Sequence, residues 1–297
     1  MGMSPLFVRI AAEAAVGPYG SAFWRVFLAL PFLAVWAKLE ERGGPARSNF
    51  KAPMLWAGVL FAGDLIFWHL SILKTSVANA TFLSTTAPVW VMLVTALVLK
   101  EKISRAALAG LVLCLIGGVA LIGDTLTFNP QHWLGDLFGL ITSFFFGMYF
   151  FAIKGARAFA GAGRTTFAAS AVCSLCLLVF ALATGDTLLP TTLKGALALI
   201  LMAAISQAFG QGLLSVALGQ LPTFFSALVI FLEAVAATAL AWIVLDEPLS
   251  LMQTWGGALI LLGIFVARPK QDPTVDPRPE DSQPQNQPAT KPSEHRA

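Results

Sequence analysis

The stretch Val98-Leu-Lys-Glu-Lys-Ile-Ser104 separates two long apolar runs, and the second run, residues 106–123, contains no charged side chain. An α-helix of about 20 apolar residues is long enough to cross the roughly 30 Å hydrocarbon core of a membrane. The charged cluster between the runs then marks the connection where the chain turns back. This segment predicts two membrane-spanning helices joined by a short loop.

The same alternation of apolar runs and charged clusters continues along the 297-residue chain, which is 57% hydrophobic and 12% charged. Soluble proteins average about 45–50% apolar and about 25% charged residues. A β-barrel is excluded because the runs are about twice the length of a tilted membrane strand and do not alternate. We predict an all-α polytopic membrane protein with spanning helices near 20–38, 53–73, 79–99, 106–123, 134–153, 165–184, 195–217, 222–244 and 251–267.

Both ends of the chain depart from this pattern. Residues 5–16 form a short apolar segment that carries Arg9 and Glu13, and counting it as a helix brings the predicted total to ten. Residues 269–297 are rich in Pro, Gln, Asp, Glu and Ser. Because such a composition buries too little apolar area to offset the entropy of ordering, we expect this tail to be disordered.

The distribution of Lys and Arg predicts the orientation, since the cytoplasmic loops of membrane proteins are enriched in both. With a cytoplasmic N-terminus, the inner connections as far as residue 270 hold twelve Lys and Arg, whereas the outer ones hold Lys74 and Lys194. We therefore expect both termini and the tail to be cytoplasmic.

An internal repeat relates the two halves of the chain. The opening heptapeptide aligns with Val244-Leu-Asp-Glu-Pro-Leu-Ser250, and the same offset of 146 residues pairs Gly110 with Gly256 and Gly117 with Gly263. A general likeness among Gly-rich membrane helices is the alternative explanation, but the paired Glu and Ser at the helix boundaries favour duplication.

Five helices per copy is an odd number, so the second copy enters the membrane in the opposite orientation. Inverted repeats are typical of secondary transporters, whose substrate sites lie near the bilayer midplane. We predict two inverted five-helix repeats, residues 1–123 and 134–267. In this register the first helix lacks its cytoplasmic end, and we expect either a start codon assigned too far downstream or a shortened chain.

Four segments carry a family resemblance: Trp24-Arg-Val-Phe-Leu-Ala29, Thr75-Ser-Val-Ala-Asn-Ala-Thr-Phe-Leu-Ser84 with Thr86-Ala-Pro-Val89, Leu99-Lys-Glu-Lys-Ile103, and Phe231-Leu-Glu233 with Leu245-Asp-Glu-Pro-Leu249. The chain resembles the drug/metabolite transporter superfamily, specifically its EamA-like ten-helix family, which includes the YddG-type amino acid exporters. The resemblance covers residues 5–267 and implies a small-solute exporter in the bacterial inner membrane. One departure is Ala234, where the family pattern usually has a proline that would kink the helix.

Other classes of function find little support. The net charge of +3 is no nucleic-acid signal, because the basic residues lie at helix ends. No Walker motif is present, and we expect no cofactor. Cys173 and Cys176 form a CxxC inside an apolar run, where small-residue packing is the expected role. With His132 in a loop and His295 in the tail, no His-rich metal site can form, so a membrane enzyme is a remote alternative.

Charged residues inside the membrane are functional candidates, because placing a charge at the bilayer centre costs roughly 2.5–3.5 kcal/mol. Asp64 and Glu233 both lie near the middle of predicted helices, where a carboxyl suits proton coupling or recognition of a substrate amine. For Glu233 a packing role is the alternative that we favour. Trp68 lies four residues after Asp64 and shares its helical face. Arg25 is expected to pair with carbonyls or a carboxylate inside the bundle.

The remaining candidate substrate-binding residues are neutral or weakly basic. Gln207 and Gln211 lie four residues apart at mid-depth and either bind a substrate or hydrogen-bond between helices. Phe146 and Tyr149 either flank the substrate or pack against lipid, and His69 is either titratable or a packing residue. Pro88 lacks an N–H and frees the carbonyl of Ser84, which is tolerated within a membrane only toward a cavity or buried in protein.

These observations together favour a monomeric secondary transporter of amino acids or related small metabolites, working by alternating access around a midplane site. Export of drugs or other cationic and aromatic compounds is the alternative, and a scaffold or channel is more remote. Proton coupling stays open.

Overall fold

Every element that the structure describes is a helix. The computed structural model describes residues 4–41, 50–123, 130–245 and 249–269, and within those ranges it contains no strand. The predicted all-α class is therefore confirmed. Residues 270–297 of the predicted disordered tail, and Glu247 of the repeat motif, lie outside the described residues.

The helices follow one another with short connections. The first half contains α1 (Ser4–Glu13), α2 (Pro18–Phe27), α3 (Leu30–Glu41), α4 (Ala52–Lys74), α5 (Val77–Thr85), α6 (Ala87–Leu97) and α7 (Arg105–Ile122). The second half contains the short 3-10 turn η2 (Pro130–His132), α8 (Trp133–Arg157), α9 (Ala162–Ala183), α10 (Leu193–Leu201), the π-helix η3 (Met202–Gln211), α11 (Gly212–Gln220), α12 (Thr223–Leu228), α13 (Phe231–Leu245) and α14 (Leu251–Ala267).

Several of these helices continue one another as membrane-spanning segments. Within the described ranges, seven segments are long and apolar enough to cross a membrane: Pro18–Glu41, Ala52–Lys74, Ala78–Leu97, Arg105–Ile122, Trp133–Arg157, Ala162–Ala183 and Leu193–Gln220. Two shorter apolar helices follow, Thr223–Ala239 and Leu251–Ala267. Each of the nine predicted spans overlaps one of these segments, and α1 occupies the place of the short first segment.

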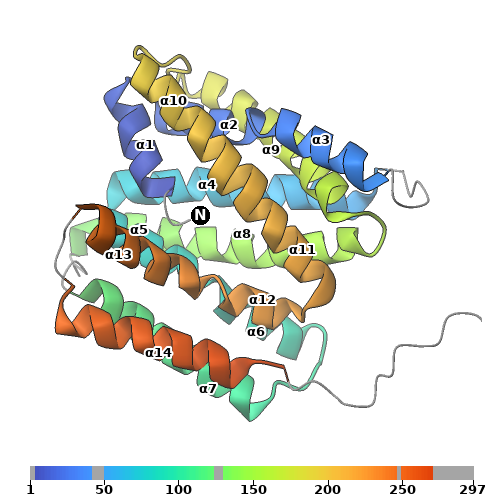
Figure 1. Ribbon diagram of the computed structural model, residues 1–297, viewed down its shortest axis with the longest axis vertical. Coiled ribbons are helices and arrows are strands. Elements are labelled where there is room, and N and C mark those ends of the chain that lie inside the picture. Colours follow the sequence, from blue (N-terminus) through green and yellow to red (C-terminus); the bar gives the residue numbers. More distant parts are fainter. Residues whose placement is uncertain (1–3, 42–49, 124–129, 246–248, 270–297) are drawn as a thin grey trace, which may run out of the picture.

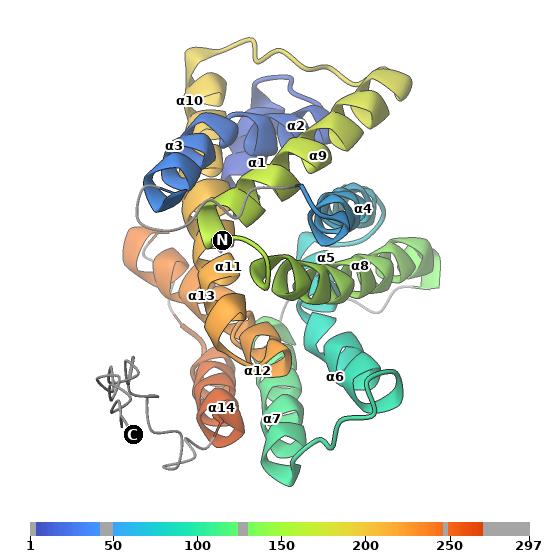
Figure 2. The same ribbon diagram turned by 90° about the vertical axis from the view of Figure 1, so that its right-hand side faces the viewer.

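The helices lie in layers, with α4 and α8 packed closely against each other in the middle of the molecule (Figures 1 and 2). The pair α7 and α14 forms one end of the long axis, and α10 lies with α1, α2, α3 and α9 toward the other. The largest group of buried apolar side chains draws on both halves of the chain, for example Phe61 on α4 and Phe150 on α8. The two halves therefore share one core.

The predicted span over 79–99 is present as Ala78–Leu97, and it is interrupted at Thr86 between α5 and α6. Pro88 lies in the first turn of α6, where its missing N–H leaves no helical hydrogen bond unmade. The amide of Thr86 bonds to the carbonyl of Leu83 at 3.1 Å, and that of Val89 bonds to Thr86 at 2.9 Å. These i to i−3 bonds tighten the chain at the break.

The corresponding segment of the second half breaks as well, between Leu228 and Phe231. The missing family proline at Ala234 therefore does not make this helix continuous. Here too the amides bond three residues back, Ile230 to Ala227 at 3.1 Å and Glu233 to Ile230 at 2.9 Å. A third break separates α2 from α3, within the predicted helix 20–38.

Helix α14 packs antiparallel against α7 through the glycines of the repeat. A Cβ on Gly110 would lie 2.5 Å from the carbonyl oxygen of Gly263, and one on Gly117 would lie 2.7 Å from that of Gly256. Glycine permits this approach because it has no side chain. Cys114 donates to the carbonyl of Ile260, 146 residues away, at 3.6 Å.

This contact shows how the two copies are related. The offset of 146 residues relates Gly110 to Gly256 and Gly117 to Gly263. The contact between Gly110 and Gly263 is therefore equivalent to the contact between Gly256 and Gly117. Only a two-fold axis between two antiparallel, equivalent helices exchanges such contacts. Ser104 and Ser250, also 146 residues apart, both cap the helices that follow them. The inverted arrangement predicted from the sequence is therefore confirmed at α7 and α14.

A second related pair of contacts links the halves at the ends of α2–α3 and α9. Glu40 accepts the backbone N–H of Ala162 at 2.8 Å and that of Gly163 at 2.9 Å, at the N-terminus of α9. Asp186, which lies 146 residues after Glu40, accepts the N–H of Gly20 near the N-terminus of α2 at 2.8 Å. A carboxylate is favourable there because the helix N-terminus carries partial positive charge. Each copy thus caps a helix of the other.

Candidate functional site

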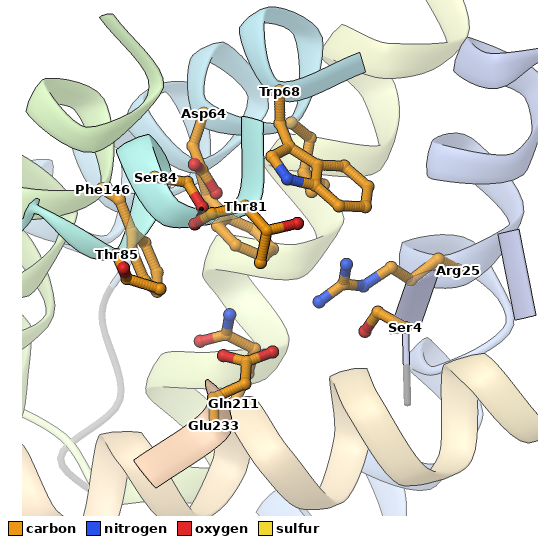
Figure 3. Close-up of a pocket in the computed structure, with 12 residues that line it drawn as sticks. Ser4, Arg25, Asp64, Trp68, Thr81, Ser84, Thr85, Phe146, Gln211 and Glu233 are labelled. Carbon is orange, nitrogen blue, oxygen red and sulfur yellow. Dashed lines mark hydrogen bonds between the residues drawn. The ribbon is translucent and has the colours of Figure 1, made fainter. Parts of the chain in front are cut away.

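A small polar cavity lies where the two halves meet (Figure 3). Its volume is about 80 Å³. Residues of the first half that line it are Ser4, Arg25, Phe61, Asp64, Leu65, Trp68, Thr81, Ser84 and Thr85, and those of the second half are Phe146, Gln211 and Glu233. Both carboxyl candidates therefore share one cavity with a basic side chain.

Helix α4 provides one wall. Phe61, Asp64, Leu65 and Trp68 are spaced three or four residues apart, so they lie along one face of the helix. The Asp64 side chain is buried, and the indole of Trp68 projects into the same space (Figure 3). This face presents one acid beside two aromatic rings.

The short helix α5 contributes hydroxyl groups just before the break at Thr86. Ser84 donates to the carbonyl of Thr81 at 2.7 Å, and Thr85 donates to that of Phe82 at 2.7 Å. Because these hydroxyl protons point to the helix backbone, the oxygens remain available to the cavity as acceptors.

The second half contributes an aromatic ring, an amide and a carboxyl group. Gln211 lies at the end of the π-helix η3, and Glu233 lies in the first turn of α13, immediately after the break. π-Helical turns occur mostly at functional sites. Tyr149 lies behind the lining, where it donates to the Gln211 side-chain oxygen at 3.3 Å and stacks on Phe61 at 5.0 Å.

Arg25 reaches the cavity from α2, near the break before α3, and its side chain is only 7% exposed. Figure 3 shows its guanidinium between the group around Asp64 and Thr81 and the group around Gln211 and Glu233. Among the described residues no carboxylate forms an ion pair with Arg25, and its Nε has no hydrogen-bond partner. The expectation that Arg25 is paired inside the bundle was therefore wrong.

Six of the ten candidate residues line the cavity: Asp64, Trp68, Ser84, Phe146, Gln211 and Glu233. The structure places the other four outside it.

Each of those four has surroundings of its own. The His69 ring nitrogen Nδ1 lies 2.7 Å from the carbonyl of Leu65, and Gln207 donates to Ser170 on α9 at 3.2 Å. Pro88 is buried in the first turn of α6, and Tyr149 lies behind the lining, where it donates to Gln211.

The sequence contained signals for several lining residues that were not selected. Thr81 and Thr85 form, with the selected Ser84, a polar stripe at helical spacing before Pro88, which is a sign of a helix face turned toward a cavity. Arg25 met the same criterion of intramembrane charge as Asp64. Ser4 gave no such signal, since its position depends on how α1 packs.

A search of the described residues finds no group of three or more His, Cys, Asp and Glu side chains able to hold a metal ion. The residues that line the cavity offer hydrogen bonds, charge and aromatic contact.

Comparison with known proteins supports the architecture. A transporter of Archaeoglobus fulgidus, described as uncharacterized, is 24% identical over 276 residues, which are 90% of this chain and 92% of the relative. An uncharacterized transporter of Helicobacter pylori is 27% identical over 163 residues, so this chain spans about half (52%) of that relative. A protein of known crystal structure is 17% identical and matches 90% of this chain with a TM-score of 0.75, which shows a shared fold.

The model of the EamA-like transporter family matches the chain over residues 1–123 and again over 133–268. These two matches cover nearly all the described residues and meet at the boundary between the halves. The chain therefore belongs to the EamA-like transporter family.

Proposed function

We propose that this protein is a secondary transporter that exports amino acids or related small organic metabolites by alternating access. The observation that carries the proposal is the cavity built by both halves, with lining residues beside the three helix breaks and at the end of the π-helix. Interrupted helices at the interface of inverted repeats are where transporters of this kind bind their substrates.

The lining suits a solute with a cationic amine and an apolar part. Asp64 and Glu233 supply two carboxyl groups, and Phe61, Trp68 and Phe146 supply aromatic surface. Carboxylates and aromatic faces both attract an ammonium group. Among the described lining residues the two acids share the cavity with one arginine, so one proton taken up by either acid would balance the charge of these three groups. This balance supports proton coupling as part of the proposal.

The volume of the cavity supports a transport cycle with a change of shape. About 80 Å³ holds a few water molecules, whereas ligand pockets measure roughly 300–1,000 Å³. The walls must therefore separate when a substrate enters. We propose that residues 1–123 and 134–267 rock against each other, with both termini in the cytoplasm and the monomer as the working unit.

Export of cationic aromatic drugs is a second candidate, favoured by the same acids and aromatic rings. The two candidates differ in whether the ligand needs a carboxylate. The proposed direction of transport, export, rests on the resemblance to exporters.

The test is transport by the purified protein in proteoliposomes, with a panel of labelled amino acids and a cationic aromatic dye. Each ligand is measured with and without a pH gradient, against protein-free liposomes. Amino acid movement that saturates supports the proposal, and acceleration by the gradient supports coupling. Movement of the dye alone favours the drug exporter, and no movement of any ligand refutes both.

A further inference from the structure

Arg25 differs from the two half-buried basic side chains in the last turn of α8. Lys154 donates to the carbonyl of Leu221 at 2.7 Å, and Arg157 donates to the carbonyls of Ser215 at 3.1 Å and Ala160 at 2.6 Å. Those two charges are satisfied by the protein. The Nε of Arg25 is buried without a hydrogen-bond partner among the described residues.

A buried charge without a hydrogen-bonded ion-pair partner is costly, and ionisable residues inside a membrane bundle are functional candidates for that reason. The guanidinium of Arg25 points into the cavity (Figure 3). Asp64 and Glu233 line the same cavity, yet neither forms an ion pair with it within the described structure. The space between the three charged groups is therefore available to a ligand that bears both signs of charge.

We infer that Arg25 binds the carboxylate of the transported substrate, which makes the substrate a small zwitterion and not a purely cationic compound. The inference rests on the proposed transport function and names its substrate class. A guanidinium presents a planar fork of N–H donors that matches a carboxylate in a bidentate manner. The hydroxyl oxygens of Ser84 and Thr85 and the two carboxyl groups act as hydrogen-bond acceptors. They therefore suit the ammonium group at the other end of the substrate and not its carboxylate.

The cavity then divides into three parts. Arg25 holds the carboxylate, Asp64 and Glu233 receive the ammonium group, and the rings of Phe61 and Trp68 contact an apolar side chain. Figure 3 shows Asp64 and Trp68 on one side of this space, Glu233 on the opposite side and Arg25 at its edge. A cationic drug without an acid would leave Arg25 unpaired beside a second positive charge, and repulsion between like charges would oppose its binding.

The experiment measures binding to the purified full-length protein, by calorimetry or by ligand-induced thermal stabilisation. The probes are phenylalanine and leucine, each beside its decarboxylated amine and its deaminated acid. For the wild type we expect the amino acids to bind most tightly. Arg25→Gln should weaken amino acid binding by about 30-fold or more, since truncating one partner of a buried charge pair has effects of that size. It should strengthen the binding of the amines, because the repulsion between Arg25 and their ammonium group is removed.

Two further variants keep the result interpretable. Arg25→Lys retains the charge without the fork and should show an intermediate loss, even if Arg25→Gln elutes as an aggregate. Lys38→Gln changes an exposed charge outside this cavity and should bind like the wild type.

The inference is overturned if the wild type binds no probe, if it binds amines as tightly as amino acids, or if the Arg25 variants keep the wild-type preference. Its failure is distinct from that of the proposed function. Binding that depends on Arg25, without movement across proteoliposomes, would refute transport and leave the carboxylate site standing. Transport that is unchanged in the Arg25 variants would refute the carboxylate site and leave the transport function standing.

Discussion

Adjacent glycines on α14 give a sharp test of the two-fold contact with α7. A Cβ on Gly256 would lie 2.6 Å from the backbone nitrogen of Leu121 and 2.7 Å from the carbonyl oxygen of Gly117. A Cβ on Gly257 would meet only the side chains of Leu121 and Val235, at 3.8 and 3.9 Å. The same substitution at neighbouring positions should therefore have opposite effects.

The expected magnitudes follow from these distances. Alanine is favoured over glycine within a helix by about 1 kcal/mol, and Gly257→Ala should gain up to that amount. Gly256→Ala has the same propensity gain but forces a methyl group against two backbone atoms, and overpacking of this kind costs about 1–3 kcal/mol. Because backbone cannot rotate away, α7 and α14 must separate. We expect Gly256→Ala to be less stable than Gly257→Ala by at least about 1 kcal/mol.

The assay is reversible unfolding of each variant in mixed micelles as the fraction of denaturing detergent increases, followed by circular dichroism. Gly117→Ala, on the partner helix, should behave like Gly256→Ala, since its Cβ would lie 2.7 Å from the Gly256 carbonyl oxygen. Equal stability of Gly256→Ala and Gly257→Ala would refute the close backbone contact, and with it this evidence for the inverted arrangement.

Three other substitutions test the site and the caps. Asp64→Asn should lower transport about tenfold or more while leaving the amount of protein in the membrane unchanged, because it removes the charge but keeps the shape; wild-type transport would exclude Asp64 from the mechanism. Glu40→Ala should destabilise the protein by about 1 kcal/mol through loss of the α9 cap, and more than Glu41→Ala, whose partly exposed pair with Arg164 is worth less; equal unfolding midpoints would contradict this. Asp186→Ala should cost a similar amount, about 1 kcal/mol, at the N-terminus of α2, and an unchanged midpoint would show that this cap is dispensable.

Much of the fold could be predicted from local sequence features. Apolar runs of membrane length placed each helix, because a bilayer demands the same minimum length of every spanning segment. The paired motifs ending at Ser104 and Ser250 predicted the duplication, and both serines cap helices in the structure. Intramembrane acids were sufficient to select Asp64 and Glu233, both of which line the cavity.

Helix breaks were harder to predict. Pro88 marks the break before α6 and Pro31, the second residue of α3, marks the break between α2 and α3, but no proline marks the break before α13. At a break without proline, the packing of the neighbouring helices decides where backbone hydrogen bonds change from i to i−4 to i to i−3. That is a property of packing and not of the segment itself.

The sequence by itself determined the all-helical class, the order of the spans and the duplication, because these depend on composition and periodicity within one segment at a time. Only the tertiary structure decided which polar residues meet. Whether Arg25 is paired, and whether Gln207 or Gln211 reaches the cavity, depends on distances between helices that are far apart in the chain. The caps by Glu40 and Asp186 likewise exist only because two copies of one bundle face each other in opposite orientations.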